Sequence, residues 1–541
     1  MTSRKILPRN FMRTFSAFLL FLFAGGIVAA PAMAMLSARE KRGKRIYLQG
    51  VTASGADIPA FLEDSGLEVT ASVLPCVNCH DYNGRGKPEG GIVPSDITWE
   101  ALTRPYGVKM ASGRRRPPYS GQSLRMAIVS GIDPAGNVLL DAMPRYRFLR
   151  DDLEDLIAYL KVIARDHDPG MSAQRLTIGT VVPASPAMRE MGEAIAAVQS
   201  AYWEDVNRRG GIYGRTIDLR IARVRQPGPE AVVAAARELV DRDQAFALEG
   251  AFIAGADDAV ARYAQEQEVP LIGPFTLTPR PEFPLNRYVF YLFSGIETES
   301  RILIDFLENR LRYEAPRVVV LYPDSDLVRN TASAILRVQR SKERSGFSER
   351  SYPPGRFDAD RLCREISLSG VDVVLFLGSG DEESRLMAAS AKLGWTPTLL
   401  LPGSLVSSDI FAAPAAFAGK IYVAFPTLPT DRTGRGAADF VEFARRHALP
   451  RSHLAAQIAT YCSAKILEEG LARAGRNVSR ERLITALEGL YEFDTGLTPR
   501  ISFGPNRRIG ASGAYVVTLD SVKRSFVPAG DWIPFQEGGG Q

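Results

Sequence analysis

Five consecutive residues, Cys76-Val77-Asn78-Cys79-His80, carry the most distinctive chemical potential of this chain. The order Cys-x-x-Cys-His is the attachment signature of a c-type haem, in which two thiols add to the two vinyl groups of one porphyrin and the histidine ligates the iron. A disulfide or half of a zinc site is the alternative, and a zinc site would need a second pair of ligands. Cys363 and Cys462 are isolated, and we expect them to be buried apolar residues, with a single bridge between them as the alternative. The motif therefore predicts one covalent haem c.

A haem iron in an electron carrier usually has a second axial ligand. Apart from His80, the histidine nearest to the motif is His167, which lies far along the sequence. We therefore expect a methionine as the second ligand. The candidates in this part of the chain are Met110, Met126, Met143 and Met171. Met143 precedes Pro144, which stiffens the loop and can fix the approach of the thioether, whereas Met126 lies in an apolar helical run and is expected in the core. We predict His80 and Met143 as the axial pair, which leaves no open position for oxygen chemistry.

The first 34 residues have the pattern of a secretory signal peptide. A basic segment is followed by an apolar run at 15–30, and Ala32-Met33-Ala34 fits the small-x-small cleavage rule. The apolar run is short for a membrane span, which needs about 20 residues. We expect cleavage after about Ala34 and a periplasmic protein, with an uncleaved N-terminal membrane anchor as the alternative.

The charge balance of the chain does not indicate nucleic acid as a partner. The chain has 66 Lys and Arg residues against 61 Asp and Glu residues, and removal of the four basic residues of the leader leaves 62 against 61. This near-neutral balance gives no reason to expect nucleic acid. The basic run 114–116 is interpreted as a solvated loop rather than a docking patch for an acidic redox partner. A length of 541 residues predicts two or three domains.

Residues 36–166 are expected to form a small helical domain. The segment 39–48 is amphipathic, and a second helix is predicted over 151–164. The predicted buried face of that second helix consists of Leu153, Leu156, Ile157, Leu160 and Ile163.

These features resemble a class I, monohaem cytochrome c. The resemblance is carried by Gly43 with Tyr47, by the haem motif, by Asp141-Ala142-Met143-Pro144 and by Tyr159-Leu160, in that order. It covers about a quarter of the chain, and the insert 49–74 departs from the family. The resemblance implies an all-α fold and one-electron transfer to a periplasmic redox partner, such as a quinoprotein dehydrogenase or a terminal oxidase chain.

After a linker at 167–174, strands and helices alternate from 175 to about 535, which implies parallel sheets. The pattern restarts once, which suggests two lobes: about 175–295 with 425–510, and about 296–424 with 511–535. This part is similar to the type I periplasmic binding proteins, and to the leucine-binding-protein-like group of ABC transporter substrate-binding proteins. The resemblance is carried by Asn207-Arg208-Arg209-Gly210-Gly211-Ile212-Tyr213-Gly214-Arg215, Gly250, Val269-Pro270-Leu271-Ile272-Gly273-Pro274 and Leu393-Gly394-Trp395.

The resemblance places a small solute at the carboxyl ends of strands, in a cleft between the lobes. The residues expected there are Phe252, Thr276, Thr278, Ser379, Asp381 and Ser404. The acid that pairs with an amino-acid ammonium in the family aligns near Gly403, and the tyrosine expected near Leu327 is absent. An unpaired ammonium is costly to bury. A neutral or anionic solute is therefore favoured, unless Asp381 replaces the missing acid.

The sequence supports three functions. The first is an exported c-type cytochrome fused to a solute-binding module, which is an electron carrier and not an enzyme. The second is an ABC-transporter substrate-binding protein that works with a permease, in which the haem domain is regulatory or a docking addition. The third is a haem enzyme acting on the bound solute. The sequence contains no nucleophile elbow, phosphate loop or metal cluster in the second part that would favour an enzyme there.

Overall fold

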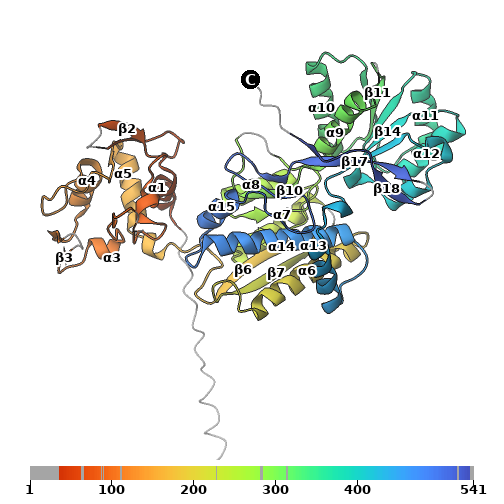
Figure 1. Ribbon diagram of the computed structural model, residues 1–541. Helices are drawn as coiled ribbons and strands as arrows, with labels where there is room; N and C mark the ends of the chain where they lie inside the picture. The colour runs from red at the N-terminus through yellow and green to blue at the C-terminus, as the bar shows by residue number, and fades with distance from the viewer. Residues whose placement is uncertain are drawn as a thin grey trace, which may run out of the picture. The chain divides into compact units, whose positions relative to one another are not determined.

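The computed structural model describes residues 36–62, 66–86, 88, 90–109, 113–226, 228–280, 284–311, 313, 315–520 and 523–535. The expected signal peptide at 1–34 and the candidate ligand Met110 lie outside the described residues. The chain divides into two compact units, Met1–Asp166 and His167–Gln541, called here the first and second unit (Figure 1). In the described ranges no helix is both long enough and apolar enough to cross a membrane.

The first unit is built on two packed helices, α1 (Ala38–Gln49) and α5 (Arg150–Leu160). Ser37 and Glu40 form a capping box that starts α1. Gly43 permits the close crossing, because a Cβ atom at this position would lie 1.9 Å from the carbonyl oxygen of Asp155. The rings of Tyr47 and Tyr159 meet beside it with centroids 5.6 Å apart. The predicted apolar face of the second helix is confirmed, since all five of its residues are buried.

Shorter elements complete the first unit. They are α2 (Cys76–His80), α3 (Trp99–Leu102), α4 (Gly121–Ser130), the turn Ile163–Arg165, and five short strands: β1 (Pro59–Leu62), β2 (Leu67–Thr70), β3 (Val108–Lys109), β4 (Arg115–Arg116) and β5 (Arg145–Tyr146). The expectation of an all-α unit is wrong. The insert 49–74 forms the β1–β2 hairpin, whose Ala60 is fully buried, and β1 also pairs with β5.

The basic run 114–116 is not a solvated loop. Arg116 is buried on β4, and its guanidinium donates to the carbonyl oxygens of Ala101 and Leu102. Arg114 lies 3.5 Å from the buried carboxylate of Asp133. Two of the three arginines therefore serve the interior of the unit, because buried backbone carbonyls and a buried carboxylate need donors.

The second unit contains two α/β lobes. Lobe 1 has a six-stranded parallel sheet in the order β16-β10-β9-β8-β6-β7. Its strands are β6 (Arg175–Pro183), β7 (Thr216–Val224), β8 (Ala247–Glu249), β9 (Leu271–Ile272), β10 (Val289–Phe293) and β16 (Ile509–Ala511). Its helices are α6 (Arg189–Arg208), α7 (Pro229–Arg237), α8 (Asp257–Glu266), α13 (Gly434–Arg446), α14 (Leu454–Ala474) and α15 (Arg480–Glu488).

Lobe 2 has an eight-stranded sheet in the order β12-β11-β13-β14-β15-β17-β18, with β19 paired to β17. Its strands are β11 (Val318–Pro323), β12 (Phe347–Tyr352), β13 (Val373–Phe376), β14 (Thr398–Pro402), β15 (Ile421–Phe425), β17 (Gly513–Asp520), β18 (Ser525–Pro528) and β19 (Ile533–Pro534). Its helices are α9 (Gly295–Asn309), α10 (Asp326–Ser341), α11 (Ala359–Ser367) and α12 (Glu382–Lys392). The first five strands are parallel as expected, whereas β17, β18 and β19 are antiparallel.

Both faces of each sheet are covered by helices, which explains the continuous apolar strands in the sequence. In lobe 1, α6 and α14 cover one face around Trp203, and α7 and α8 cover the other around Leu248. In lobe 2, α11 and α12 cover one face, and α9 and α10 the other. Cys462 and Cys363 are buried in lobes 1 and 2 respectively, and neither forms a disulfide, which confirms their expected role as core residues.

Candidate functional site

His80 is the best-defined functional side chain of the first unit. It ends α2, and its Nδ1 atom lies 2.9 Å from the carbonyl oxygen of Ser95. A carbonyl oxygen only accepts, so Nδ1 carries the hydrogen and the lone pair of the ring is on Nε2. Burial lowers the pKa of His80, which keeps the imidazole neutral. The side chain is thus prepared to ligate a metal through Nε2, with its ring orientation fixed by a backbone partner.

The two cysteines lie on the same short helix. Pro75 precedes it in an extended conformation, and Cys76 and Cys79 are not joined by a disulfide. Burial raises the pKa of Cys76 to about 12, so this side chain is a neutral thiol at physiological pH. In the described part of the chain, no group of three or more His, Cys, Asp or Glu side chains is arranged to hold a metal ion.

Helix α1 and strand β5 hold the haem motif in place. Tyr47 on α1 donates its hydroxyl to the carbonyl oxygen of Asp81, the residue after His80, at 2.6 Å. Tyr146 on β5 donates to the carbonyl oxygen of Leu74, two residues before Cys76, at 2.7 Å. Both ends of α2 are therefore tied to the frame of the unit.

Met143 lies on the segment that reaches the motif. It is half-buried, Pro144 after it is buried, and β5 begins at Arg145. Arg145 donates to the carbonyl oxygens of Met143 and Leu139, which fixes the loop. Because Tyr146, three residues after Met143, is bonded to Leu74, the structure brings the Met143 segment to the start of the motif.

The other methionines have different surroundings. Met126 on α4 is 44% exposed, so the expectation that it belongs to the core is wrong. Helix α4 buries the face that carries Leu124, Ala127 and Ile128 instead. Met171 belongs to the second unit, where it packs against the core of lobe 1.

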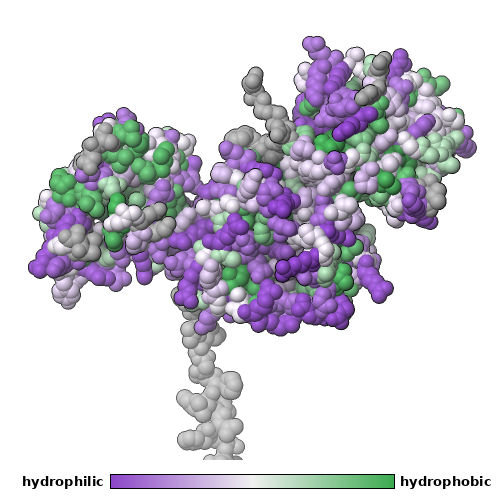
Figure 2. Space-filling model, viewed as in Figure 1, coloured by the Kyte–Doolittle hydropathy of each residue, from purple (hydrophilic) through white to green (hydrophobic). Residues whose placement is uncertain are grey.

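The first unit exposes many large apolar side chains. Figure 2 shows green patches over this unit, and the exposed residues in its described part are Leu67, Val73, Ile92, Val93, Tyr106, Met126, Val129, Ile132, Val138, Leu140 and Leu149. Five of them, Leu67, Val73, Ile92, Val93 and Leu140, lie within about twenty residues of the motif or next to the Met143 loop in the sequence. Exposed apolar surface of this extent marks a surface for interaction or for ligand binding.

The predicted solute residues of lobe 1 lie at the carboxyl ends of β8 and β9. Phe252 and Phe275, called here the phenylalanine pair, are bridged by backbone hydrogen bonds and have ring centroids 6.4 Å apart. The hydroxyl of Thr276 donates to Asp257, at the start of α8, and accepts from the amide of Thr278 at 2.9 Å. The hydroxyl of Thr276 therefore has partners within lobe 1, and its contact with a solute stays a prediction.

In lobe 2, Ser379 and Asp381 follow β13 and are exposed. The amide of Ser379 donates to Glu382 at 3.2 Å, and Asp381 lies 3.8 Å from Arg385. Both side chains remain accessible, in agreement with a position on a binding surface.

Ser404 follows β14 and has a partner that the sequence did not predict. Its hydroxyl donates to Oε1 of Glu299 at 2.6 Å and its amide to Oε2 at 3.1 Å. Glu299 is fully buried on α9, and burial raises its pKa to about 7. A signal existed, because Glu299 interrupts the helical apolar series of Ile296 and Leu303.

A second buried glutamate, Glu249, ends β8 in lobe 1. It accepts from Nε2 of Gln199 at 3.0 Å, and the same nitrogen donates to the hydroxyl of Thr180 at 3.0 Å. Burial raises the pKa of Glu249 to about 7. Gly250 follows with a positive φ of 57°, and a Cβ atom there would lie 2.7 Å from Gln199. This polar cluster therefore lies directly beneath the turn that leads to Phe252.

The first turn of α9 joins the two sets of residues. The carbonyl oxygen of Leu277, between Thr276 and Thr278, accepts from the amide of Ile296 at 2.9 Å. One turn later, Glu299 binds Ser404. The structure thus brings Thr276, Thr278 and Ser404 to one place, where the chain passes from lobe 1 into lobe 2, while β13 and β14 are neighbouring parallel strands.

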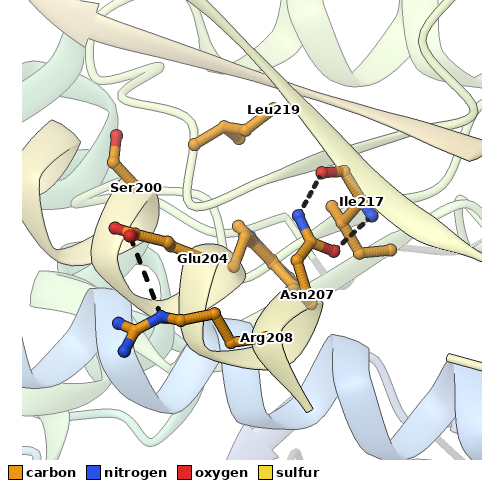
Figure 3. A pocket seen from close by; sticks show the side chains of 7 residues that line it. Ser200, Glu204, Asn207, Arg208, Ile217 and Leu219 are labelled. Atoms are coloured by element: carbon orange, nitrogen blue, oxygen red, sulfur yellow. Dashed lines mark hydrogen bonds and ion pairs between the residues drawn. The ribbon is translucent and has the colours of Figure 1, made fainter. Parts of the chain in front are cut away.

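One hollow of about 430 Å³ lies elsewhere, between α6 and the edge strand β7 (Figure 3). Asn207 exchanges hydrogen bonds with the backbone of Ile217 at 2.7 and 2.8 Å, and Arg208 pairs with Glu204. These polar groups satisfy one another, and Ile217 and Leu219 belong to the first half of β7. The hollow is therefore away from the carboxyl ends of the strands and does not suit the solute.

A second hollow, of about 490 Å³, lies at those carboxyl ends. It is lined by Val182, Pro183, Ala184, Arg189, Gly192, Glu193, Arg223 and Arg225. The sequence did not predict it, because most of α6 and β7 lies between the two arginines at the end of β7 and the other lining residues.

Known proteins resemble the second unit over most of its length. The sequence model of the family described as periplasmic binding protein matches residues 175–524. An amino acid binding protein of Pseudomonas aeruginosa is 26% identical over 247 residues, which are 44% of this chain and 64% of that protein, just under two thirds of its length. A Leu/Ile/Val-binding protein of Rhizobium johnstonii is 21% identical over 333 residues, which are 61% of this chain and 87% of that protein.

Solved structures show the same fold. A fatty acid ABC transporter substrate-binding protein from Thermomonospora curvata has a TM-score of 0.56 at 19% identity, over 69% of this chain and 95% of that chain. A branched-chain amino acid ABC transporter protein from Thermus thermophilus with bound valine has a TM-score of 0.57 at 17% identity, over 67% of this chain and 97% of that chain. The two-lobed α/β fold and the match over 175–524 show that the chain belongs to the periplasmic binding protein family.

Proposed function

We propose that the protein is an exported, ABC-transporter-type solute-binding protein, and that a small solute binds between its two lobes. The observation that carries this proposal is the family membership over 175–524, together with the position of the candidate residues around the start of α9. The partner expected from this class is an ABC permease. One of the similar structures is a fatty acid ABC transporter substrate-binding protein and another contains bound valine, so the fold alone does not select the solute.

Ligand screening tests the solute-binding function. A solute that binds the folded chain raises its melting temperature by mass action, by an amount that grows with solute concentration. We expect a stabilising compound among small organic acids, amides and amino acids, confirmed by calorimetry at a stoichiometry of one. If no compound of any of these classes, and no fatty acid, shifts the melting temperature at millimolar concentration, the solute-binding function is wrong.

We further propose that the first unit carries one covalent haem c. The observation that favours it is the orientation of His80 by Ser95 on a helix that also carries both cysteines. Cys76 and Cys79 would each add their S–H across one vinyl group to form a thioether, with Nε2 of His80 and the sulfur of Met143 as axial ligands. Bound haem c supplies one-electron chemistry. The residues of the chain itself keep the imidazole of His80 neutral through burial and fix its ring through Ser95, and Met143 would supply the second ligand.

Mass spectrometry of the denatured protein tests the attachment. We expect the polypeptide to retain the mass of one haem after acid-acetone extraction, and the Cys76→Ala/Cys79→Ala variant to lack it. Cys363→Ala is the matched control, because Cys363 is buried in lobe 2 next to Ser390. Haem that is extracted from the parent protein would show that the motif does not attach it.

Measuring the reduction potential with and without solute distinguishes the possible roles of the haem unit. An electron carrier, with a periplasmic redox partner such as a quinoprotein dehydrogenase or a terminal oxidase chain, should show a reversible potential that does not depend on solute. A regulatory or docking role predicts a potential, or an affinity for the permease, that changes when solute binds. A haem enzyme acting on the solute needs an open iron position, so binding of carbon monoxide by the unmodified reduced protein would favour that function.

A further inference from the structure

The hollow at the carboxyl ends of β6 and β7 has an unusual charge. Its described lining holds three arginines, Arg189, Arg223 and Arg225, and one acid, Glu193. In the described part of the chain, none of the three guanidinium groups has a hydrogen bond or an ion pair with another residue. By contrast, Arg220 on the same strand pairs with Asp218 at 2.7 Å. The hollow, called here the arginine hollow, therefore concentrates positive charge that the protein does not neutralise.

The alternation of β7 explains how two of these arginines reach the hollow. Side chains at every second residue share one face of a strand. Ile217, Leu219 and Ile221 pack under α6, whereas Ala222 and Val224 pack against the cluster on the opposite face. Arg223 and Arg225 continue the α6 face beyond the last apolar residue. Positive side chains thus occupy positions that would otherwise extend the core.

Helix α6 forms the wall of the hollow that faces the arginines of β7, and it is held there by a close contact with the end of β6. A Cβ atom on Gly192 would lie 1.8 Å from the carbonyl oxygen of Pro183, so a glycine is required where the helix meets the end of β6. This contact places the first turn of α6, with Arg189 and Glu193, over the end of the sheet. The floor of the hollow is apolar, formed by Val182, Pro183 and Ala184.

The arginine hollow adjoins the predicted solute region. Val182 packs in one small cluster with Phe275, Ile195 and Ala196. Phe275 belongs to the phenylalanine pair, and the amide of Phe252 donates to the carbonyl oxygen of Val181 at 2.7 Å. The last residues of β6 therefore line the hollow and also contact the phenylalanine pair.

These surroundings match a carboxylate on a short carbon chain. A guanidinium group forms two parallel hydrogen bonds to a carboxylate, and such charge-assisted bonds are stronger than neutral ones. A volume of about 490 Å³ is in the range of small-molecule sites. The apolar floor and the nearby phenylalanine rings suit a hydrocarbon chain rather than a hydrated inorganic anion.

We propose that the arginine hollow binds the carboxylate of a small organic acid, with Arg223 and Arg225 as charged contacts and Arg189 on the α6 side. This inference rests on the proposed solute-binding function and narrows it to anionic solutes. Glu193 limits the net charge of the site, which favours a monoanion or dianion over a polyphosphate.

Calorimetry on the full-length haem-loaded protein tests the inference, with butyrate, succinate, the neutral analogue succinamide and inorganic phosphate as probes. We expect butyrate or succinate to bind, and succinamide and phosphate to bind at least tenfold more weakly. Affinity for the carboxylate should also fall as sodium chloride is raised, because the contacts are charged and partly exposed. Arg223→Gln and Arg225→Gln should each weaken the carboxylate by about ten- to a hundredfold, as expected for the loss of hydrogen bonds to a charged group.

Arg220→Gln is the matched control. Arg220 is an exposed arginine on the same strand, three residues before Arg223 and paired with Asp218, so its loss should change the affinity by less than about twofold. Unaltered melting temperatures of the three variants without solute show that the fold is intact. Equal carboxylate affinity in Arg223→Gln, Arg225→Gln and the parent would overturn the inference, as would phosphate or succinamide binding as tightly as succinate.

The test separates the inference from the function on which it rests. Binding of a neutral solute or an amino acid, with no binding of any carboxylate, overturns the anion site and leaves the solute-binding function standing. A protein that binds no solute of any class loses both.

Discussion

The Nδ1 atom of His80 lies 2.9 Å from the carbonyl oxygen of Ser95, and this contact determines which nitrogen of the ring can bind a metal. The Cys-x-x-Cys-His motif predicts an iron ligand at this position but not its tautomer. Ser95 belongs to the loop between α2 and α3, where Asp96 accepts from the amide and hydroxyl of Thr98 at 2.9 and 2.6 Å. The segment 95–98 that orients His80 is thus held by its own hydrogen bonds.

Met143→Ala tests Met143 as the second ligand of the proposed haem. We expect loss of the sulfur-to-iron absorption band in the red and new binding of carbon monoxide to the reduced protein, since the sixth position becomes open. Met126→Ala is the control, because Met126 is an exposed methionine of the same unit. If the band persists in Met143→Ala and disappears in Met110→Ala, the ligand assignment is wrong.

Gly43→Ala should destabilise the first unit. The added Cβ atom would lie 1.9 Å from the carbonyl oxygen of Asp155, so α1 and α5 must separate, at a cost of about 3 kcal/mol. Gly121→Ala is the matched control in α4, where the nearest atom to the added Cβ is 3.8 Å away. The control should be neutral or stabilising by about 0.5 kcal/mol. Urea denaturation followed by circular dichroism measures both, and equal stability of the two variants would contradict the close crossing.

Several parts of the fold could be predicted from local patterns. The apolar face of α5, the parallel strands of lobe 1 and the burial of Cys363 and Cys462 follow from periodicity and composition. The β1–β2 hairpin could not be predicted in this way, because its pairing with β5 joins residues more than eighty positions apart. The burial of Arg116 was missed for a different reason: its carbonyl partners, Ala101 and Leu102 on α3, come next to it only in the folded unit.

The candidate site was predictable only in outline. Turn residues in the sequence mark where strands end, so Phe252, Ser379 and Ser404 could be placed at the carboxyl ends of strands. Hydrogen-bond partners could not, because Glu299 meets Ser404 only after the chain has folded through four strands of lobe 2. The arginine hollow could not be predicted for a similar reason, because Arg189 and Arg223 lie far apart in the sequence and meet only in the folded lobe.

The two buried glutamates predict how stability depends on pH. Burial raises the pKa of Glu299 from 4.5 to about 7, so the folded state holds a proton that the unfolded state releases between these values. The stabilising contribution is therefore complete below about pH 4.5 and is lost as pH rises through about 7. We expect the free energy of unfolding to fall by about 2 kcal/mol between pH 5 and pH 8 from this group. Glu249 acts in the same direction.

Glu299→Gln should reduce that pH dependence. The amide of glutamine is neutral at all pH values, and its NH2 group can donate to the hydroxyl of Ser404, which can also accept. Glu297→Gln is the control on the same helix, because Glu297 is 40% exposed and pairs with Arg301. Denaturant unfolding at pH 5 and pH 8 measures the difference. A pH dependence that is the same in Glu299→Gln and in the parent would show that Glu299 ionises normally in the folded protein.

Leucine, isoleucine and valine should not bind with micromolar affinity, although the relative from Rhizobium johnstonii is named for them. The structure adds Glu299 beneath Ser404, but this side chain is fully buried and both of its oxygens already accept from Ser404. Among the predicted solute residues the exposed acid is Asp381, which is 66% exposed and 3.8 Å from Arg385. A solute ammonium enclosed near Ser404 would find the oxygens of Glu299 already occupied, and burying an ammonium without a partner costs several kcal/mol, enough to remove ordinary affinity.

Calorimetry with the three amino acids decides this prediction. Asp381→Asn identifies a substitute acid, and Asp360→Asn is the control, because Asp360 is an exposed aspartate of α11 in the same lobe. Micromolar binding of an amino acid that is lost in Asp381→Asn and kept in Asp360→Asn would contradict the prediction and assign the ammonium to Asp381. No binding of the three amino acids, with binding of a carboxylate that depends on Arg223 and Arg225, would instead locate the charge recognition of this protein at the arginines of lobe 1.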